Sequence, residues 1–271
     1  MAQLYETHSH TPLCKHAEGT PGEYAAVAQA RGLAGLIVTC HSPMPDGFSP
    51  AVRMAPEQLP EYFDLVAKAR EEWQGKVDIL LGLESDYLPG MEAWLEKLHS
   101  KAEFHYILGS VHPHLRDYRE RYFTGDAAEF LACYYEHLAA AAETGLFDSL
   151  AHPDLVKNVI ADHWNVGTAL DVVRRALDRI AKTGVAMELN TSGLNKKISE
   201  MNPGPEILKE IHARGIPVVL GADAHTPKRV GDQFETALRQ LRGIGFATVS
   251  GFRNRKRYEI PIDAALASLK A

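Results

Sequence analysis

Short runs of β-branched and aliphatic residues alternate with longer amphipathic stretches along most of this 271-residue chain. Each short run has the length and composition of a buried strand, and each longer stretch has the apolar spacing of a helix. Because parallel strands need a crossover connection, repeated strand–helix units predict a parallel α/β sheet. We predict strands at residues 4–7, 35–39, 77–83, 104–111, 149–151, 185–189 and 217–220.

The stretches between these runs carry start and stop signals of helices. Thr20 is a predicted N-cap with Pro21 in the first turn, and Gly215 follows a helix that begins at Pro205. Seven β/α units without a strand–strand hairpin either close into a barrel or form an open sheet. We predict helices at 22–31, 56–72, 90–99, 126–143, 169–182, 205–213 and 232–242, the last clear helix, with an edge strand at 246–250.

Length and composition restrict the class of protein further. The chain is long enough for one large domain or two small ones. Since it shows no linker, low-complexity tract or block of charge, we predict a single domain over residues 1–271. The net charge of -6 argues against a nucleic-acid partner.

The cysteines and the first residues predict where the protein works. Cys14, Cys40 and Cys133 are widely spaced and include no CxxC pair, so neither a zinc finger nor a disulfide framework is indicated. Free thiols are typical of a reducing compartment. The N-terminus lacks the basic and apolar regions of a signal peptide, and no apolar run approaches the roughly 20 residues that span a bilayer. We expect a cytoplasmic protein without a membrane partner.

Nine residues with metal-binding side chains follow the predicted strands. One of them lies in the loop after the first strand, and the others come directly after an aliphatic run. Since the carboxyl ends of parallel strands meet at one face, and a closed ring brings them around one point, these side chains favour a barrel over an open sheet. Their number predicts a multinuclear metal site and therefore an enzyme. The nine residues are His8, His10, His16, His41, Glu84, His112, His152, Asp223 and His225.

The spacing of these residues suggests how ions are shared. His8 and His10 are two residues apart, so on a strand both face the same side, and Asp223 and His225 repeat this spacing. Alone, such a pair is a weak signal, and any one residue could be a polar group at a barrel rim. Together, nine ligands suit two or three divalent ions, with Glu84 as the bridging carboxylate. Imidazole and carboxylate ligands fit zinc, manganese or iron, and the sequence does not choose among them.

Seven motifs carry a resemblance to a known family. They are ETHSHTPLCKH, TCHSP, GLESDYLPG, GSVHPH, LAHPDLVK, ELNTSG and GADAH. Together they resemble the PHP (polymerase and histidinol phosphatase) superfamily, and within it the monofunctional histidinol-phosphate phosphatases, from about residue 4 to about residue 250. The resemblance implies a distorted seven-stranded (βα)7 TIM-like barrel.

The resemblance also implies a ligand set for each ion. One ion would take His8, His10, Glu84 and Asp223, and a second would share Glu84 and take His112 and His152. A third would take His16, His41 and His225. The chain departs from the family pattern at Cys40, where relatives commonly have aspartate. Because successive strand residues point in opposite directions, we expect Cys40 to be a small buried residue rather than a ligand beside His41.

The implied activity is hydrolysis of a small-molecule phosphate monoester, L-histidinol phosphate, to L-histidinol and phosphate in histidine biosynthesis. A metal-bridging hydroxide would attack phosphorus, with Glu84 and Asp223 as the catalytic carboxylates. Alternatives are a PHP-type phosphodiesterase or nuclease, a broad-specificity phosphoesterase, an amidohydrolase, for which no strand ends in the required lysine, and a non-catalytic metal-binding protein. The sequence does not specify the oligomeric state.

Substrate contacts are less well marked. Phosphate needs a cationic partner, and Arg229 and Lys196 are the preferred candidates. His114 could approach the substrate. An acidic or aromatic wall for the imidazole and amine could come from Tyr87, Tyr118 or Asp86. The other cationic candidates are Lys157, Lys197, Lys228, Arg253, Arg53 and Arg116.

Overall fold

Seven parallel strands form one sheet in the order β1 to β7 in this computed structural model, which describes residues 4–270. The ends of the sheet meet, because Ser9 forms a parallel bridge to Ala224 and the His10 amide donates to the Ala224 carbonyl at 3.0 Å. The predicted seven-stranded barrel is therefore confirmed. The single-domain prediction includes residues 1–3 and 271, which lie outside the described residues. The strands are β1 Tyr5–Ser9, β2 Gly35–Val38, β3 Asp78–Asp86, β4 Tyr106–Ser110, β5 Ser149–Leu150, β6 Ala186–Asn190 and β7 Val218–Gly221.

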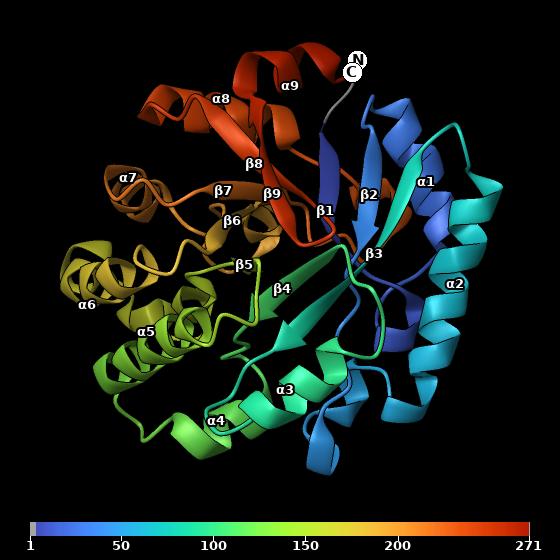
Figure 1. The fold of residues 1–271 in the computed structure, drawn as a ribbon. Helices are drawn as coiled ribbons and strands as arrows, with labels where there is room; N and C mark the ends of the chain where they lie inside the picture. Colours follow the sequence, from blue (N-terminus) through green and yellow to red (C-terminus); the bar gives the residue numbers. More distant parts are fainter. Residues whose placement is uncertain (1–3, 271) are drawn as a thin grey trace.

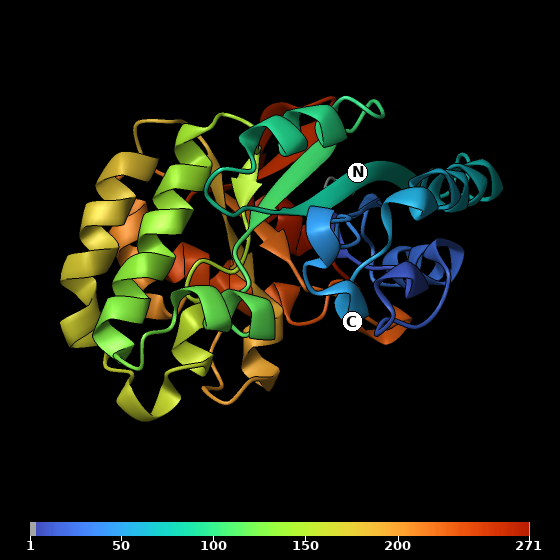
Figure 2. The ribbon, with the colours of Figure 1, turned by 90° about the horizontal axis from the view of Figure 1, so that it is seen from below.

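Helices surround the strands (Figure 1), and α5 and α6 pack together on one side of the molecule, away from α1 and α2 (Figure 2). The predicted N-cap of α1 is confirmed, since the Glu23 amide donates to Thr20 Oγ1 and the Glu23 carboxylate accepts from the Thr20 amide. Within residues 4–270, every helix is too short or too polar to cross a lipid bilayer. The helices are α1 Pro21–Ala30, α2 Leu59–Glu72, α3 Glu92–His99, α4 Arg116–Tyr122, α5 Ala127–Glu143, α6 Val166–Ile180, α7 Pro205–Ala213, α8 Phe234–Ile244 and α9 Ile262–Ser268.

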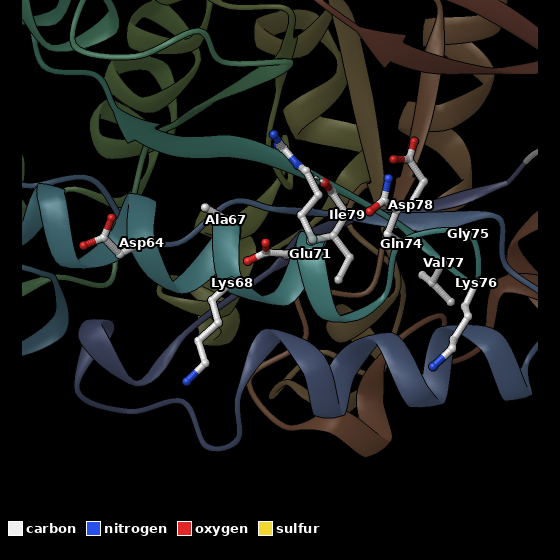
Figure 3. Close-up of a pocket in the computed structure, with 11 residues that line it drawn as sticks. Asp64, Ala67, Lys68, Glu71, Gln74, Gly75, Lys76, Val77, Asp78 and Ile79 are labelled. Carbon is white, nitrogen blue, oxygen red and sulfur yellow. Dashed lines mark hydrogen bonds between the residues drawn. The ribbon is translucent and has the colours of Figure 1, made fainter.

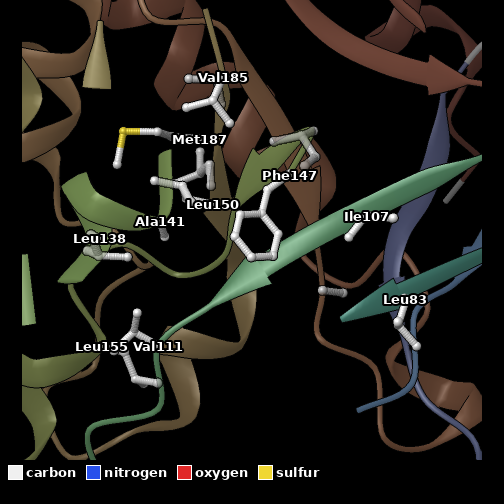
Figure 4. Packing of buried hydrophobic residues seen from close by; sticks show 14 of the residues in the cluster. Leu83, Ile107, Val111, Leu138, Ala141, Phe147, Leu150, Leu155, Val185 and Met187 are labelled. Atoms are coloured by element: carbon white, nitrogen blue, oxygen red, sulfur yellow. The ribbon is translucent and has the colours of Figure 1, made fainter. Parts of the chain in front are cut away.

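The main hydrophobic core lies between the barrel and these helices. Leu150 of β5 and Met187 of β6 pack toward Leu138 and Ala141 of α5, with Phe147 filling the space beside β4 (Figure 4). Gly109 of β4 faces the Phe147 ring so closely that a Cβ atom there would overlap it. This packing fixes the strand positions, and hence the positions of the side chains at their carboxyl ends.

The end of the chain differs from prediction. Instead of an edge strand, Thr248–Arg253 (β8) pairs antiparallel with Lys256–Pro261 (β9) in a separate two-stranded sheet, and α9 follows. The expected absence of hairpins was therefore wrong, and α4 and α9 were not anticipated, whereas the helix predicted at 232–242 is present as α8. The turn residues Asn254 and Arg255 have φ of 52° and 61°, as a tight hairpin requires. Because this turn lacks glycine, its sequence signal is weak.

The hairpin closes the inside of the barrel. Phe252 of β8 is buried against the Tyr106 ring, with ring centroids 5.1 Å apart. Both belong to a small hydrophobic cluster to which most of the strands contribute side chains. The hairpin crosses the ring of strands in Figure 1. The other members of this cluster are Ile37, Leu80, Leu108, Ala151, Ala186 and Val219, with Tyr5 packed against it.

The burial of Phe252 inside the barrel leads to a prediction about stability. Phe252→Ala should lower the free energy of unfolding by about 3–5 kcal/mol, because it leaves a cavity that the surrounding strands cannot fill. Urea denaturation followed by circular dichroism measures this. Phe123→Ala is the matched control, since Phe123 is 41% exposed and Phe252 only 5%, and it should cost less than about 1 kcal/mol. Equal losses of unfolding free energy in the two variants would contradict the role of Phe252 in filling the inside of the barrel.

Candidate metal centre

The nine predicted ligand residues come together at the carboxyl ends of the strands. His8 lies within β1 and Glu84 within β3, while the other side chains follow their strands in the connecting loops. Barrel geometry brings these positions together: His41, just after β2, forms a parallel bridge with Glu84, and the Ser42 amide donates to the Glu84 carbonyl at 2.8 Å. The loop residue His16 also joins the group, with its ring centroid 4.6 Å from that of His225.

Glu84 is the centre of the cluster and is fully buried. Its Oε2 atom lies 2.6 Å from His41 Nδ1, 3.4 Å from His8 Nε2 and 3.7 Å from His10 Nε2. Its Oε1 atom lies 3.2 Å from the Nε2 atoms of both His112 and His152. One carboxylate therefore faces five imidazoles, three on one oxygen and two on the other.

Asp223 forms a second acidic point beside Glu84. Its Oδ1 atom lies 3.1 Å from His10 Nε2 and 3.6 Å from His8 Nε2, and Ser192 Oγ donates to Oδ2 at 3.1 Å. Asp223 has a φ of 51° and His152 a φ of 28°, values that residues other than glycine rarely adopt. Strained backbone of this kind concentrates at functional sites, where the surrounding structure holds it.

Behind the cluster lies Glu188 of β6, which sequence reasoning missed. His8 Nδ1 donates to Glu188 Oε1 at 2.7 Å, and the His152 amide donates to Oε2 at 2.8 Å. Because a carboxylate only accepts, His8 must carry its proton on Nδ1, which leaves Nε2 free to face Glu84. β6 was the one predicted strand to which no ligand had been assigned, and a buried glutamate in its ELNTSG motif was the available signal.

Asp86 supports His112 in the same way. His112 Nδ1 donates to Asp86 Oδ2 at 3.0 Å, and Arg53 Nη2 donates to the same oxygen at 2.9 Å. The expectation that Asp86 forms a wall against the substrate is therefore corrected: it is 3% exposed and lies behind a candidate ligand. Arg53 is likewise held by Asp86 and by the Ser42 carbonyl, at 3.0 Å, rather than free for phosphate.

Two further histidines are oriented by backbone carbonyls. His16 Nδ1 lies 2.7 Å from the Cys14 carbonyl, and His225 Nδ1 lies 3.0 Å from the Asp223 carbonyl, so each ring keeps Nε2 as a free nitrogen. Among the described residues, the buried atoms His8 Nε2, His10 Nδ1 and His225 Nε2 meet no hydrogen-bond partner. Buried donors and acceptors left in this state are costly, and bound cations would satisfy them. The side chains thus fit a metal site.

The electrostatics of the cluster agree with this reading. Burial alone would raise the pKa of Glu84, but the surrounding imidazoles, His41 first, hold it well below its usual range. Burial lowers the pKa of His41 to about 3 and that of His225 to about 2. Both rings are therefore neutral near pH 7, the form that binds metal. His8, His10 and His112 differ. Burial opposes their charge, but nearby carboxylates raise the pKa of all three, that of His10 to about 9 and that of His112 to about 10, so a bound cation would have to displace a proton from each.

Cys40 is fully buried, as expected from sequence. Thr11 Oγ1 donates to Cys40 Sγ at 3.1 Å. Cys14 is also fully buried, and its hydrogen bond to Cys40 together with burial raises the pKa of its thiol. Cys14 Sγ, Cys40 Sγ and a nitrogen of His10 lie within 4.8 Å of one another. The thiols thus extend the cluster on the His10 side.

A cavity of about 1130 Å³ opens onto the cluster. The preferred phosphate candidates Lys196 and Arg229 line it, as does His114, which was expected to approach the substrate. Lys196 Nζ lies 3.8 Å from Asp223 Oδ2, and Arg229 pairs with Asp232. Among the residues that the structure describes, five cations line this cavity against one carboxylate, Asp223. The five are Arg53, Arg119, Lys196, Lys228 and Arg229.

Several other candidates for substrate contact were wrong. Lys157 is fully buried and donates to Asp154 at 2.8 Å. Arg253 pairs with Asp78, the first residue of β3, at the opposite end of the barrel. The remaining candidates bond elsewhere and lie outside the lining of the cavity within residues 4–270: Arg116 with Glu120, Lys197 with Asp162, Tyr87 with Glu92, and Tyr118 with His137.

A second hollow, of about 850 Å³, lies along α2 and the turn into β3 (Figure 3). Its charged side chains, among them Asp64, Lys68 and Lys76, are spread along its length rather than directed at one point. Since Asp78 marks the start of β3 and Glu84 lies toward its end, this hollow is separate from the histidine cluster.

Comparisons with known proteins agree with the geometry. A family model described as a PHP domain matches residues 6–192. A probable histidinol-phosphatase of Deinococcus radiodurans is 40% identical over 266 residues, covering 94% of this chain and 99% of that protein. The histidinol-phosphatase of Bacillus subtilis is 26% identical and covers 87% of this chain and 98% of its own. A histidinol phosphate phosphatase from Lactococcus lactis, solved with zinc, L-histidinol and phosphate, has 20% identity and a TM-score of 0.79, covering 95% of this chain and 100% of that one. This last likeness supports the barrel fold.

Proposed function

Because the chain belongs to the PHP domain family, we propose that it is a metal-dependent phosphomonoesterase that hydrolyses L-histidinol phosphate to L-histidinol and phosphate. A relative of nearly equal length and 40% identity, a probable histidinol-phosphatase, supports the substrate. This reaction belongs to histidine biosynthesis. A location in the cytoplasm stays a prediction.

The observation that carries the proposal is the meeting of five imidazole nitrogens within 3.7 Å of one buried carboxylate, Glu84. A purely structural role would leave several of these polar atoms without partners in a dry interior, at a cost of about 1–3 kcal/mol each. Two or three divalent ions of zinc, manganese or iron would satisfy them.

We assign the ligands in three sets around Glu84. His8, His10 and Asp223 form one set with Glu84, and their donor atoms lie within 4.8 Å of one another. The second set also includes Glu84 and adds His112 and His152, whose Nε2 atoms both face Glu84 Oε1. The third set comprises His16, His41 and His225, and an ion held there would make the site trinuclear. Divalent ions held there would lower the pKa of a water molecule and offset charge on the phosphoryl oxygens.

The protein's own side chains position the ligands and the substrate. Glu188 and Asp86 hold the rings of His8 and His112 with Nε2 toward Glu84. The cationic cavity attracts a phosphate group toward the cluster, with Lys196 and Arg229 at its lining. Orientation of the phosphate ester against a fixed set of ligands supplies the proximity that hydrolysis requires.

A phosphate-release assay tests the proposal. The purified protein is compared on L-histidinol phosphate, an aryl phosphate and a dinucleotide, each with and without a chelator. A strong preference for L-histidinol phosphate that the chelator abolishes supports the proposal. Similar rates on all three substrates would leave a broad phosphoesterase, preference for the dinucleotide would indicate a phosphodiesterase, and activity that resists the chelator would remove the metal mechanism.

Lys196 offers a sharper test of phosphate binding. Lys196→Met should raise KM for L-histidinol phosphate roughly 10- to 100-fold, because a charge-assisted hydrogen bond contributes about 1.5–3 kcal/mol. Steady-state kinetics at fixed ionic strength measure this change. The neighbouring variant Lys197→Met is the control, since Lys197 points outward to Asp162. If both variants keep the wild-type KM, Lys196 does not contact the phosphate.

A further inference from the structure

Cys14 lies beside two of the candidate ligands. Its Sγ atom and one nitrogen each of His16 and His225 all lie within 4.8 Å of one another. Zinc–sulfur bonds of about 2.3 Å and zinc–nitrogen bonds of about 2.0 Å place tetrahedral donors roughly 3.5 Å apart. The observed spacing therefore needs only a small closing movement to surround one ion.

The local backbone holds this arrangement. A short 3-10 helix, Pro12–Cys14, ends at Lys15, whose φ of 70° turns the chain back. This turn brings His16 Nδ1 to the Cys14 carbonyl at 2.7 Å, so residues 14 and 16 are held against each other. Cys14 is fully buried, so its thiol is shielded from solvent.

A second observation points independently to a ligand. His225 Nε2 is buried and meets no hydrogen-bond partner within residues 4–270, while its Nδ1 is engaged with the Asp223 carbonyl. His41, the third residue expected with His16 and His225, has its Nδ1 at 2.6 Å from Glu84 Oε2, and it groups with His10 and His225 as well as with Glu84 and His112. Three imidazoles leave one position of a four-coordinate zinc ion open, and Cys14 is the side chain grouped with both His16 and His225.

We propose that Cys14 is a thiolate ligand of the ion held by His16 and His225, which makes this subsite a sulfur-containing one. The inference rests on the proposed metal-dependent function and deepens it. A coordinating thiol is deprotonated outright by a divalent cation. Cys40 supports Cys14 from behind rather than binding the ion, since it groups with His10 and Cys14 but not with His16 or His225.

The proposal has a consequence for metal choice. A thiolate is a soft ligand that favours zinc over manganese, whereas imidazole and carboxylate alone discriminate less. Cys14→Ser should therefore lower the preference of the third subsite for zinc over manganese by at least about tenfold. Competition dialysis with elemental analysis measures the ratio without reference to catalysis.

Cobalt substitution tests the ligand directly. Cobalt(II)-loaded wild-type protein should show sulfur-to-cobalt charge-transfer absorption in the near ultraviolet. Cys14→Ser should lose this absorption, while Cys40→Ser and Cys133→Ser should keep it, Cys133 lying apart on α5. Absence of the band in fully loaded wild-type protein, or its persistence in Cys14→Ser, would overturn the proposal.

Zinc-edge X-ray absorption of the wild-type protein gives an answer even where Cys14→Ser folds poorly. A sulfur scatterer at about 2.3 Å is expected, and a shell of nitrogen and oxygen alone would reject the thiolate. Failure of the inference is distinct from failure of the function. Hydrolysis of L-histidinol phosphate by protein without the sulfur signal would reject only the Cys14 ligand, and the signal in protein without hydrolysis would reject only the activity.

Discussion

Replacement of Glu84 by glutamine should reduce kcat for L-histidinol phosphate by at least about a thousandfold, which corresponds to roughly 4 kcal/mol of lost transition-state stabilisation. Glu84 offers both oxygens to histidine-lined positions, three imidazoles on one side and two on the other. In the glutamine variant an NH2 group replaces one carboxylate oxygen, and this group cannot bind a cation. Phosphate release and elemental analysis of the same sample measure activity and bound metal together.

The control for this variant is Glu96→Gln on the exposed side of α3. It makes the same chemical change without touching the cluster, and it should keep wild-type kcat and metal content. Glu84→Gln with near-normal turnover and a full complement of metal would contradict the central role of Glu84. Loss of activity with unchanged metal content would instead assign Glu84 to substrate or water rather than to the ions.

Glu188→Gln should weaken metal binding or activity by about 10- to 100-fold, the range typical of residues that orient metal ligands. The variant keeps the size of the side chain but removes the charge that holds the proton on His8 Nδ1 at 2.7 Å. It also weakens the bond from the His152 amide. Metal titration with a competing chelator measures the affinity. Excess metal should restore part of the activity of this variant, but not that of Glu84→Gln.

The role of Glu188 can be tested without altering it. A Cβ atom at Gly221 would overlap Glu188 Oε1 and lie 2.7 Å from His8 Cβ. Gly221→Ala should therefore displace Glu188 and reproduce the metal-binding defect. Gly243→Ala is the matched control, since a Cβ there meets nothing within 4 Å, and in the last turn of α8 it should be neutral or stabilising. Normal metal affinity in Gly221→Ala would argue against an orienting role for Glu188.

Much of the fold could be predicted from the sequence, because the spacing of apolar residues in strands and helices is a local property. The seven strands and helices such as α7 lie close to their predicted bounds, since aliphatic runs, caps and proline positions act over a few residues. The β8–β9 hairpin was missed because its turn, at Asn254 and Arg255, carries no glycine. Its exposed second strand also shows little of the alternation that marks a half-buried one.

The sequence by itself determined which side chains could bind metal and that they follow the strands, because residue identity and strand ends are both local. Only the tertiary structure decided their partners: Glu188 reaches His8 across 180 residues, Asp86 supports His112, and Cys14 comes to His225. The physical reason is closure of the barrel, which sets contacts between distant strands through packing of the whole core. No local pattern records such contacts.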